Sequence, residues 1–264
     1  MPNHTSPTPN SLVPNSLAPN TILLAGASGG IGSALLGELE KEYPQATILT
    51  ISRRELATAT GNHSHLTTSL ADPKSVGKVT EWLRQKPLPN WVINCCGALH
   101  WQSDGQNYVK SHAPEKSVGQ CTDDALLQSV ATNVLTHLHL AQGFAPLIQR
   151  REPLTWVSLS AKVGSIEDNR LGGWYSYRMS KAALNMLVRN LAIEWARKVD
   201  HCRVVAVHPG TTDTPLSQPF QENIPAGKLY SPAQTAGRMV SVIRGLREED
   251  HGKLLFWDGT PIPW

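Results

Sequence analysis

A short apolar run, a glycine-rich turn and a helical pattern follow one another early in the chain, and this order restricts the fold most. Residues 21–25 read Thr-Ile-Leu-Leu-Ala, residues 26–32 read Gly-Ala-Ser-Gly-Gly-Ile-Gly, and leucines at positions 35, 36 and 39 follow. A run this apolar is typical of a strand buried on both faces of a sheet. We therefore expect a parallel sheet covered by helices, with the first strand leading into the first helix through a tight turn.

The glycine-rich turn is suited to the phosphates of a dinucleotide. Glycines let the backbone approach the pyrophosphate, and a helix N-terminus offers free amides and the positive end of its dipole. The spacing is Gly-x-x-x-Gly-x-Gly, and no Lys-Ser/Thr pair follows, so the turn is not a P-loop. A tight turn without a ligand is the alternative. The expected cofactor contacts are Gly26, Ser28, Gly30, Ile31 and Gly32.

Strand-like and helix-like patterns then alternate along the chain. Further apolar runs lie at 47–51, 91–97, 155–159, 202–207 and 253–257, and helical patterns lie at 72–83, 123–148, 177–195 and 231–245. The alternation predicts the α/β class, with a single doubly wound parallel sheet flanked by helices on both faces. We expect residues 21–264 to form this one domain. Residues 1–20 are rich in Pro, Asn and Ser and are expected to form a disordered tail.

Tyr177 and Lys181 are four residues apart in a helical pattern, which puts them on one face, one turn apart. An ammonium close to a phenol favours the phenolate and lowers a pKa that is ordinarily about 10. Such a phenol can exchange a proton with a carbonyl or an alcohol near neutral pH. The spacing also arises by chance in many helices, so the other motifs decide between the two interpretations.

Arg53 and Arg54 follow the second apolar run, about 20 positions past the glycines, where this fold meets the adenosine ribose. A carboxylate there would hold the bare 2′-hydroxyl of NAD, whereas arginines match a 2′-phosphate. The pair favours NADP(H), with NAD(H) as the alternative.

Composition excludes several classes of protein. The net charge of +3 over 264 residues is too small to indicate nucleic-acid or membrane binding. No apolar run is long enough to span a bilayer, and no signal peptide is recognisable. The four cysteines lack the CxxC spacing of a zinc or redox site, so we expect no metal and reduced thiols in a cytoplasmic protein.

Six motifs in this order resemble the short-chain dehydrogenase/reductase family over nearly all of residues 21–264. They are Gly26-x-x-x-Gly30-x-Gly32, Asn94-x-x-Gly97, Asn133, the strand-end serine, Tyr177-x-x-x-Lys181 and Pro209-Gly210-x-x-x-Thr214. The Gly164-Ser165-Ile166 loop, the approach from Gly172 and the Trp-Asp-Gly…Pro-Trp ending are most similar to the C-factor and sniffer-like carbonyl reductases.

The resemblance implies a role for each residue. Tyr177 would protonate the substrate carbonyl, and Lys181 would hold the nicotinamide ribose and keep the tyrosine pKa low. Asn133 would hold a water that links Lys181 to solvent. The strand-end serine would hydrogen-bond the carbonyl oxygen. The cofactor contacts implied in addition to the glycine-rich turn and the two arginines are Asn94, Gly97, Pro209, Gly210, Thr212 and Thr214.

Three positions depart from the family pattern. The usual Ser-Ser pair reads Ser160-Ala161, so we take Ser160 as the serine, with Ser165 as the alternative. Ser69 stands where an aspartate usually lies near the adenine, and Cys95-Cys96 replaces Asn-Ala.

The sequence thus predicts an NADP(H)-dependent oxidoreductase of small carbonyls or secondary alcohols. The alternatives are a dinucleotide-binding signalling protein of C-factor type with little turnover, and an NAD-dependent alcohol dehydrogenase. Apolar residues on more than one face of the helix at 177–195 predict a homodimer or homotetramer.

Overall fold

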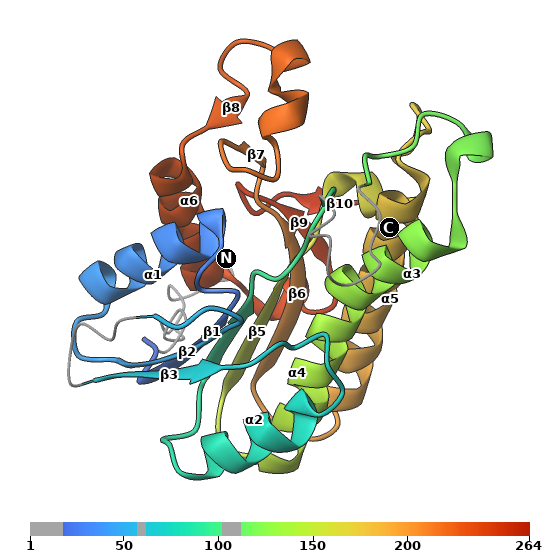
Figure 1. Ribbon diagram of the computed structural model, residues 1–264. Helices are drawn as coiled ribbons and strands as arrows, with labels where there is room; N and C mark the ends of the chain where they lie inside the picture. Colours follow the sequence, from blue (N-terminus) through green and yellow to red (C-terminus); the bar gives the residue numbers. More distant parts are fainter. Residues whose placement is uncertain (1–17, 57–61, 102–111) are drawn as a thin grey trace, which may run out of the picture.

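The computed structural model describes residues 18–56, 62–101 and 112–264, and an eight-stranded sheet lies at its centre (Figure 1). The strand order is β10-β9-β6-β5-β4-β1-β2-β3. All neighbours pair in parallel except β10 and β9, because the short turn between them can only fold the chain back on itself. The strands are β1 Thr21–Ala25, β2 Thr47–Ser52, β3 His63–Thr67, β4 Trp91–Asn94, β5 Leu154–Leu159, β6 Cys202–His208, β9 Leu254–Phe256 and β10 Pro261–Ile262.

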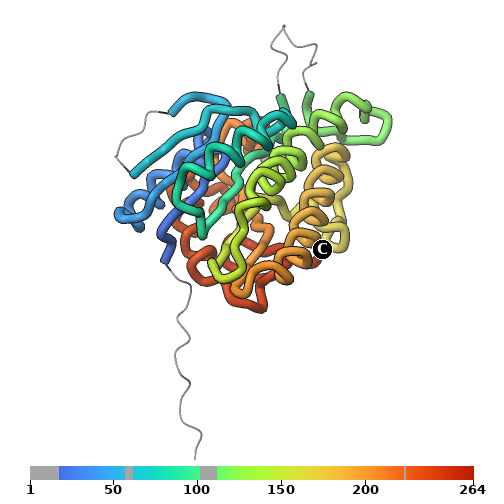
Figure 2. Tube along the Cα trace, turned by 90° about the horizontal axis from the view of Figure 1, so that it is seen from below, coloured from blue at the N-terminus to red at the C-terminus, as the bar shows by residue number. Residues whose placement is uncertain are grey.

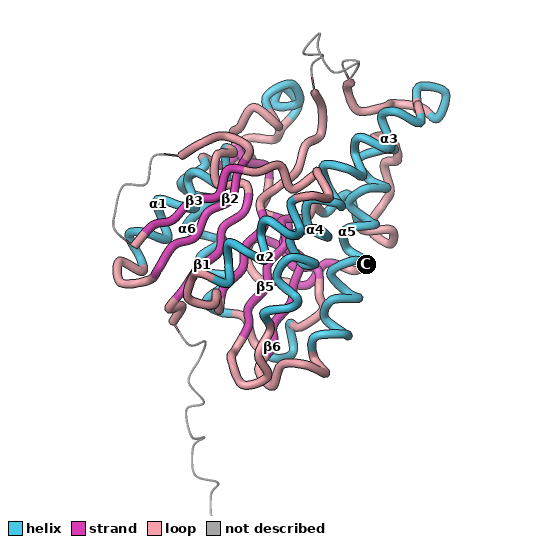
Figure 3. Tube along the Cα trace, turned by 60° about the horizontal axis from the view of Figure 1, so that its bottom comes forward, coloured by secondary structure: helices cyan, strands magenta, loops and turns pink. Residues whose placement is uncertain are grey.

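Helices cover both faces of this sheet, as the predicted fold class requires. α1 (Gly30–Glu42) and α6 (Pro232–Gly245) share one hydrophobic core with one face. α2 (Ser75–Arg84), α4 (Thr136–Phe144) and α5 (Tyr175–Trp195) share the other core, where they lie side by side (Figures 2 and 3). The β1, β2, β4 and β5 runs are buried almost throughout, which explains their continuous apolar sequence.

The strand order reverses beside β1, since β1 pairs with β2 on one side and with β4 on the other. In open α/β sheets, ligands bind at the carboxyl ends of the strands next to such a reversal. The glycine-rich turn leaves β1 at this edge, and the candidate site residues after β4, β5 and β6 reach the same edge.

The helix expected over residues 123–148 is interrupted. α3 (Asp123–Val130) passes through a π-helical turn at Ala131–Leu135 into α4, and a 3₁₀ turn at Ala145–Leu147 follows. Asn133 lies inside the π-helical turn, a feature that recurs at functional sites. A smaller pair of strands, β7 (Thr211–Thr212) and β8 (Leu229–Tyr230), lies beside the sheet, with a 3₁₀ turn at Gln218–Asn223 between them.

The start of α6 is as the sequence predicted. The helix predicted after Ser231 is confirmed as α6, since the Ser231 hydroxyl accepts from the Gln234 amide in a capping box. The expected N-terminal tail falls mainly on residues 1–17, which lie outside the described residues. No helix in the described part of the chain is long and apolar enough to cross a membrane.

Candidate active site

Tyr177 and Lys181 lie on one face of α5, and both side chains are buried, with 8% and 4% of their surface exposed. The ammonium of Lys181 lies 5.8 Å from the centroid of the Tyr177 ring. It donates a hydrogen bond to the carbonyl oxygen of Leu159 at 3.0 Å, where β5 ends. The spacing read from the sequence therefore brings a phenol and an ammonium together at the carboxyl edge of the sheet.

Burial dominates the acid–base behaviour of this pair. It raises the pKa of Tyr177 and lowers the pKa of Lys181 to about 8, because each charged form loses water. The sequence predicted that the ammonium would lower the pKa of the phenol. The pKa of the phenol is raised in the free protein because burial removes the phenolate from water, and the ammonium 5.8 Å from the ring centroid does not offset that cost.

Asn133 ties the loop after β4 to α5. Its Oδ1 accepts from the Ala98 amide at 2.8 Å, and its Nδ2 donates to the Ala98 carbonyl at 2.9 Å and to Ser180 Oγ at 3.0 Å. A Cβ atom at Gly97 would lie 3.2 Å from Asn133 Oδ1 and 3.3 Å from Lys181 Nζ. The loop can therefore pass this close to the lysine because position 97 carries no side chain.

Both amide atoms of Asn94 are engaged within the fold. Its Oδ1 accepts from the Cys96 amide at 2.9 Å, and its Nδ2 donates to the Thr136 carbonyl at 3.3 Å. Asn94 therefore fixes the chain where it leaves β4.

The two serines proposed from the sequence have partners elsewhere. The hydroxyl of Ser160 donates to Asn185 Oδ1 at 2.6 Å, and Ser165 Oγ accepts from the amide of Asp168 at 3.1 Å. The strand-end residue that packs in the same apolar cluster as Tyr177 is Ala161. Because side chains alternate in extended backbone, Ser160 and Ala161 point to opposite sides.

The glycine-rich turn has the geometry its sequence predicted. Gly26 has a left-handed φ of +78°, and a Cβ at Gly32 would lie only 2.1 Å from the Gly26 carbonyl oxygen. A Cβ at Gly30 would lie only 2.6 Å from Thr214 Cγ2, so the start of α1 packs closely against the loop after β6 because position 30 carries no side chain. Ile31 packs partly against the core beneath α1.

The arginines at the end of β2 reach toward this turn. Both side chains are exposed, and the guanidinium of Arg54 donates to the carbonyl oxygen of Ser28. The carbonyl of Arg54 in turn lies 3.1 Å from His65 Nε2 on β3. Arg54 thus spans from the second strand to the glycine-rich turn.

Residues from other segments hold the loop after β6 in place. Pro209 is buried, and Gly210 has a φ of +81°, with Trp257 and Tyr230 3.1 Å from the position of a Cβ. Thr212 Oγ1 shares a 2.8 Å hydrogen bond with Thr235 Oγ1 on α6. These contacts therefore fix residues 209–214 next to the glycine-rich turn.

An apolar cluster surrounds the ring of Tyr177. Its ring packs with Leu99 and Ala161, and Val163, Trp174 and Phe220 complete the cluster. The Trp174 ring centroid lies 6.2 Å from that of Tyr177 and 5.3 Å from that of Phe220. No pattern in the sequence around Leu99 or Phe220 indicated that they join this cluster.

The sequence also matches a known protein family. The sequence profile of the short chain dehydrogenase family matches residues 20–225. The chain belongs to this family. As a short-chain dehydrogenase/reductase it is an oxidoreductase, and its helix-covered, mostly parallel sheet is the fold that the resemblance implied.

Relatives and structural neighbours agree with the subgroup seen in the sequence. An uncharacterized oxidoreductase, C663.09c of Schizosaccharomyces pombe, is 25% identical over 91% of this chain and 96% of its own. C-signal of Myxococcus xanthus is 31% identical over 53% of this chain and 78% of its own. Carbonyl reductase Sniffer of D. melanogaster has the same fold, with a TM-score of 0.76 and 23% identity over 93% of this chain and 99% of that one.

The site of this short-chain dehydrogenase fits a pyridine nucleotide. The N-cap residue of α1, Gly29, makes no side-chain capping bond, so the first amides of the helix can bind a pyrophosphate, and Arg54 binds the neighbouring Ser28. The buried ammonium of Lys181 has only one hydrogen-bond acceptor, Leu159, among the described residues and can donate to ribose hydroxyls. That part of the chain holds no cluster of His, Cys, Asp and Glu side chains that could bind a metal ion.

Proposed function

We propose that the chain is an NADP(H)-dependent oxidoreductase that reduces a carbonyl compound, or oxidises a secondary alcohol, with Tyr177 as the acid and base. The observation that carries this proposal is the burial of a phenol and an ammonium together beside Gly97, between the ends of β4 and β5. An apolar wall around the phenol keeps water away from the group that transfers the proton.

Each residue has a distinct task in this reaction. The bound nicotinamide supplies or accepts the hydride. Tyr177 donates its phenolic proton to the carbonyl oxygen, and Lys181, once it binds the ribose, stabilises the phenolate that remains. Asn133 keeps the loop after β4 against α5, and its Oδ1 retains a lone pair for a water on the path from Lys181 to solvent.

The serine has the least support among these assignments. Ser160 could stabilise the carbonyl oxygen only after its hydroxyl leaves Asn185, and Ser165 only after it reorients from the amide of Asp168. Tyr177 therefore carries most of the stabilisation, and Ser160 contributes a smaller part.

The preference for NADP(H) rests on Arg53 and Arg54. Two exposed guanidinium groups at the end of β2, one of them bonded to the glycine-rich turn, suit the dianionic 2′-phosphate. The other cofactor contacts proposed are the glycines at 26, 30 and 32 together with Pro209, Gly210, Thr212 and Thr214. NAD(H) remains the alternative, and a melting-temperature comparison separates the two, because a cofactor at 100 times its Kd stabilises by about 2.7 kcal/mol.

A second candidate function is dinucleotide binding for signalling with little turnover. The observation that favours it is Ala161, an alanine where a hydroxyl would face the carbonyl oxygen. The buried Tyr177–Lys181 pair argues against it. Burying two ionisable groups costs free energy, and a protein that only binds the dinucleotide would gain no catalysis in return.

We also propose that the chain forms a homodimer or homotetramer in the cytoplasm. Met179, Met186 and Ile193 recur every seven residues on α5 and are 44%, 60% and 45% exposed, which gives the helix an apolar stripe. The four cysteines are free thiols, which suits a reducing compartment. Light scattering on wild type and on Met186→Glu tests this assembly. A monomeric mass for wild type, unchanged in Met186→Glu, would contradict it.

The deciding experiment measures NADPH consumption with a panel of aldehydes, ketones and quinones, comparing wild type with Tyr177→Phe. The phenylalanine keeps the ring in its apolar cluster and removes only the proton donor. We expect turnover to fall by at least about 100-fold, the usual size of an acid–base contribution, while NADPH still raises the melting temperature. Equal turnover in the two proteins would refute Tyr177 as the acid.

A further inference from the structure

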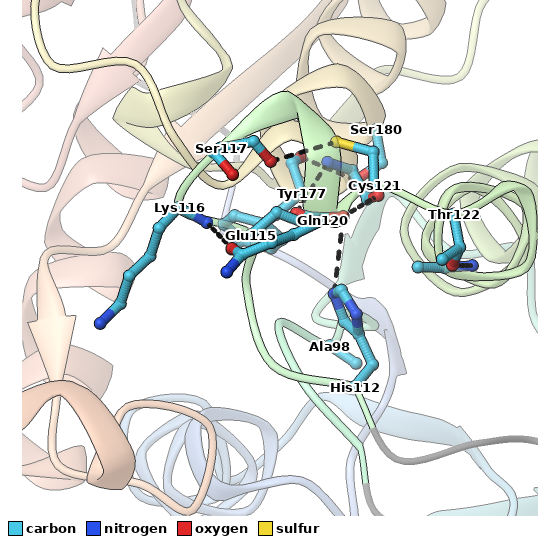
Figure 4. Close-up of polar contacts among 12 residues, drawn as sticks. Ala98, His112, Glu115, Lys116, Ser117, Gln120, Cys121, Thr122, Tyr177 and Ser180 are labelled. Carbon is cyan, nitrogen blue, oxygen red and sulfur yellow. Dashed lines mark hydrogen bonds and ion pairs between the residues drawn. The ribbon is translucent and has the colours of Figure 1, made fainter.

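Glu115 is a carboxylate that the mechanism does not use, and it is 97% buried, with 3% of its surface exposed. It lies in the loop before α3, close to the start of α5 (Figure 4). Within residues 18–56, 62–101 and 112–264, no lysine or arginine forms an ion pair with it. The imidazole of His112 lies close by, with Nε2 at 4.0 Å from Oε1. Without a lysine or arginine partner among these residues, the buried carboxylate depends on the hydrogen bonds that it accepts.

The carboxylate binds the first turn of α5. Its Oε2 accepts from the amide of Ser176 at 3.2 Å, and its Oε1 accepts from the Ser176 hydroxyl. The backbone of Glu115 is engaged as well, since its carbonyl oxygen accepts from the amide of Trp174. Glu115 therefore accepts three hydrogen bonds, which hold Trp174 and Ser176 in the first turn of the helix.

The helix start needs this support because its N-cap residue provides no capping side chain. The N-cap residue is Trp174, whose side chain makes no capping bond and whose backbone is left-handed, with φ 51° and ψ 43°. Left-handed backbone is unfavourable for a residue with a Cβ, so the turn that Gly172 and Gly173 begin must be held by other groups. Arg178 holds the two glycines, since its Nε donates to both of their carbonyl oxygens, and Glu115 holds Trp174. Glu115 accepts from the second helical amide, as an N-cap side chain ordinarily does, from 61 residues earlier in the chain.

Tyr177 is the next residue after this contact. On its other side, Ser180 Oγ donates to the Tyr177 carbonyl at 2.8 Å and is itself bound by Asn133. The segment that carries the phenol is thus held at its N-terminal side by Glu115 and at its C-terminal side by Asn133. The indole of Trp174, which packs against the phenol, is fixed through the same backbone.

We propose that Glu115 is a positioning residue for the reaction, which acts through Ser176 and Trp174 to fix the direction of the Tyr177 phenol and of the pocket wall beside it. This inference rests on the proposed function, because it concerns the same acid. Displacing a catalytic group by about 1 Å can lower turnover by about 100-fold.

The test compares Glu115→Ala, Glu115→Gln and Ser176→Ala in the full chain, with NADPH and the carbonyl compound that wild type reduces fastest. Glu152→Ala, an exposed glutamate before β5, is the matched control. We expect Glu115→Ala to lower kcat by about 100-fold, with KM and the Kd of NADPH within threefold of wild type. The kcat of Glu115→Gln should be about tenfold higher than that of Glu115→Ala, because the glutamine amide oxygen still accepts from the Ser176 amide. Adding Ser176→Ala to Glu115→Gln should lower kcat little further, since both changes disturb one contact.

The outcomes separate the two proposals. Wild-type kcat in both Glu115→Gln and Ser176→Ala, or a loss that appears in KM or in NADPH binding and leaves kcat unchanged, would overturn the positioning role. If Glu115→Ala does not fold, these two milder variants decide the question. Tyr177→Phe is measured in parallel: if it retains turnover, the assigned acid is wrong, whatever the Glu115 variants do.

Discussion

Asn133→Ala tests whether the π-helical turn of the α3–α4 helix exists to hold the active-site loop. The side chain is fully buried and makes three hydrogen bonds, two with the Ala98 backbone and one with Ser180. Each bond contributes about 1 kcal/mol net, so their loss costs about 3 kcal/mol. For a domain of this size the melting temperature should fall by about 6–12 °C.

Asn185→Ala is the matched control for this prediction. Asn185 is also a buried helical asparagine, but it makes one side-chain hydrogen bond, from the Ser160 hydroxyl at 2.6 Å. Its replacement should cost about 1 kcal/mol, so urea unfolding of the two variants should differ by about 2 kcal/mol. Turnover should fall further in Asn133→Ala, because Ser180 and the loop after β4 lose their common anchor.

Equal destabilisation of the two variants would refute this reasoning. It would mean that the bonds between Asn133 and Ala98 add nothing beyond what water provides when the turn opens. The π-helical turn would then be a consequence of packing, without a role in holding the loop.

Three further changes test the site. Lys181→Met should remove a pH dependence of stability: burial lowers the pKa of this lysine to about 8. The unfolded value is about 10.4, so the lysine's own contribution to stability is complete above that pH, and up to about 3 kcal/mol of it is lost as the pH falls to about 8. Other buried groups titrate in the same range, so the test is the difference between urea titrations of wild type and Lys181→Met, which should change with pH by this amount. Arg54→Ala should weaken NADPH binding by at least about tenfold, the value of a charge-assisted bond, and leave NADH binding unchanged; equal losses in melting-temperature shifts would contradict the 2′-phosphate contact. Ala161→Ser should raise kcat several-fold by adding a donor beside Tyr177, whereas Ser160→Ala should lower stability by about 1 kcal/mol with little change in kcat; the reverse pattern would return the serine role to Ser160.

The glycine-rich turn and the Tyr177–Lys181 pair could be read from the sequence because their geometry is local. A spacing of four in a helix sets one face, and glycines between a buried strand and a helix allow one kind of turn. The same holds for α6, whose start at Ser231 is determined by residues within one helical turn. The alternation of apolar runs and helical patterns likewise determined the α/β class.

Tertiary packing decided what depends on distant neighbours. The partner of Ser160 is on a helix 25 residues later, and that of Ser176 is in a loop 61 residues earlier, so no local pattern could indicate either contact. The high pKa of Tyr177 has the same origin, because the water that a phenol loses is excluded by residues from several parts of the chain. The sequence by itself determined which groups are available for the chemistry, and only the packed structure decided how they are held and how strongly they are ionised.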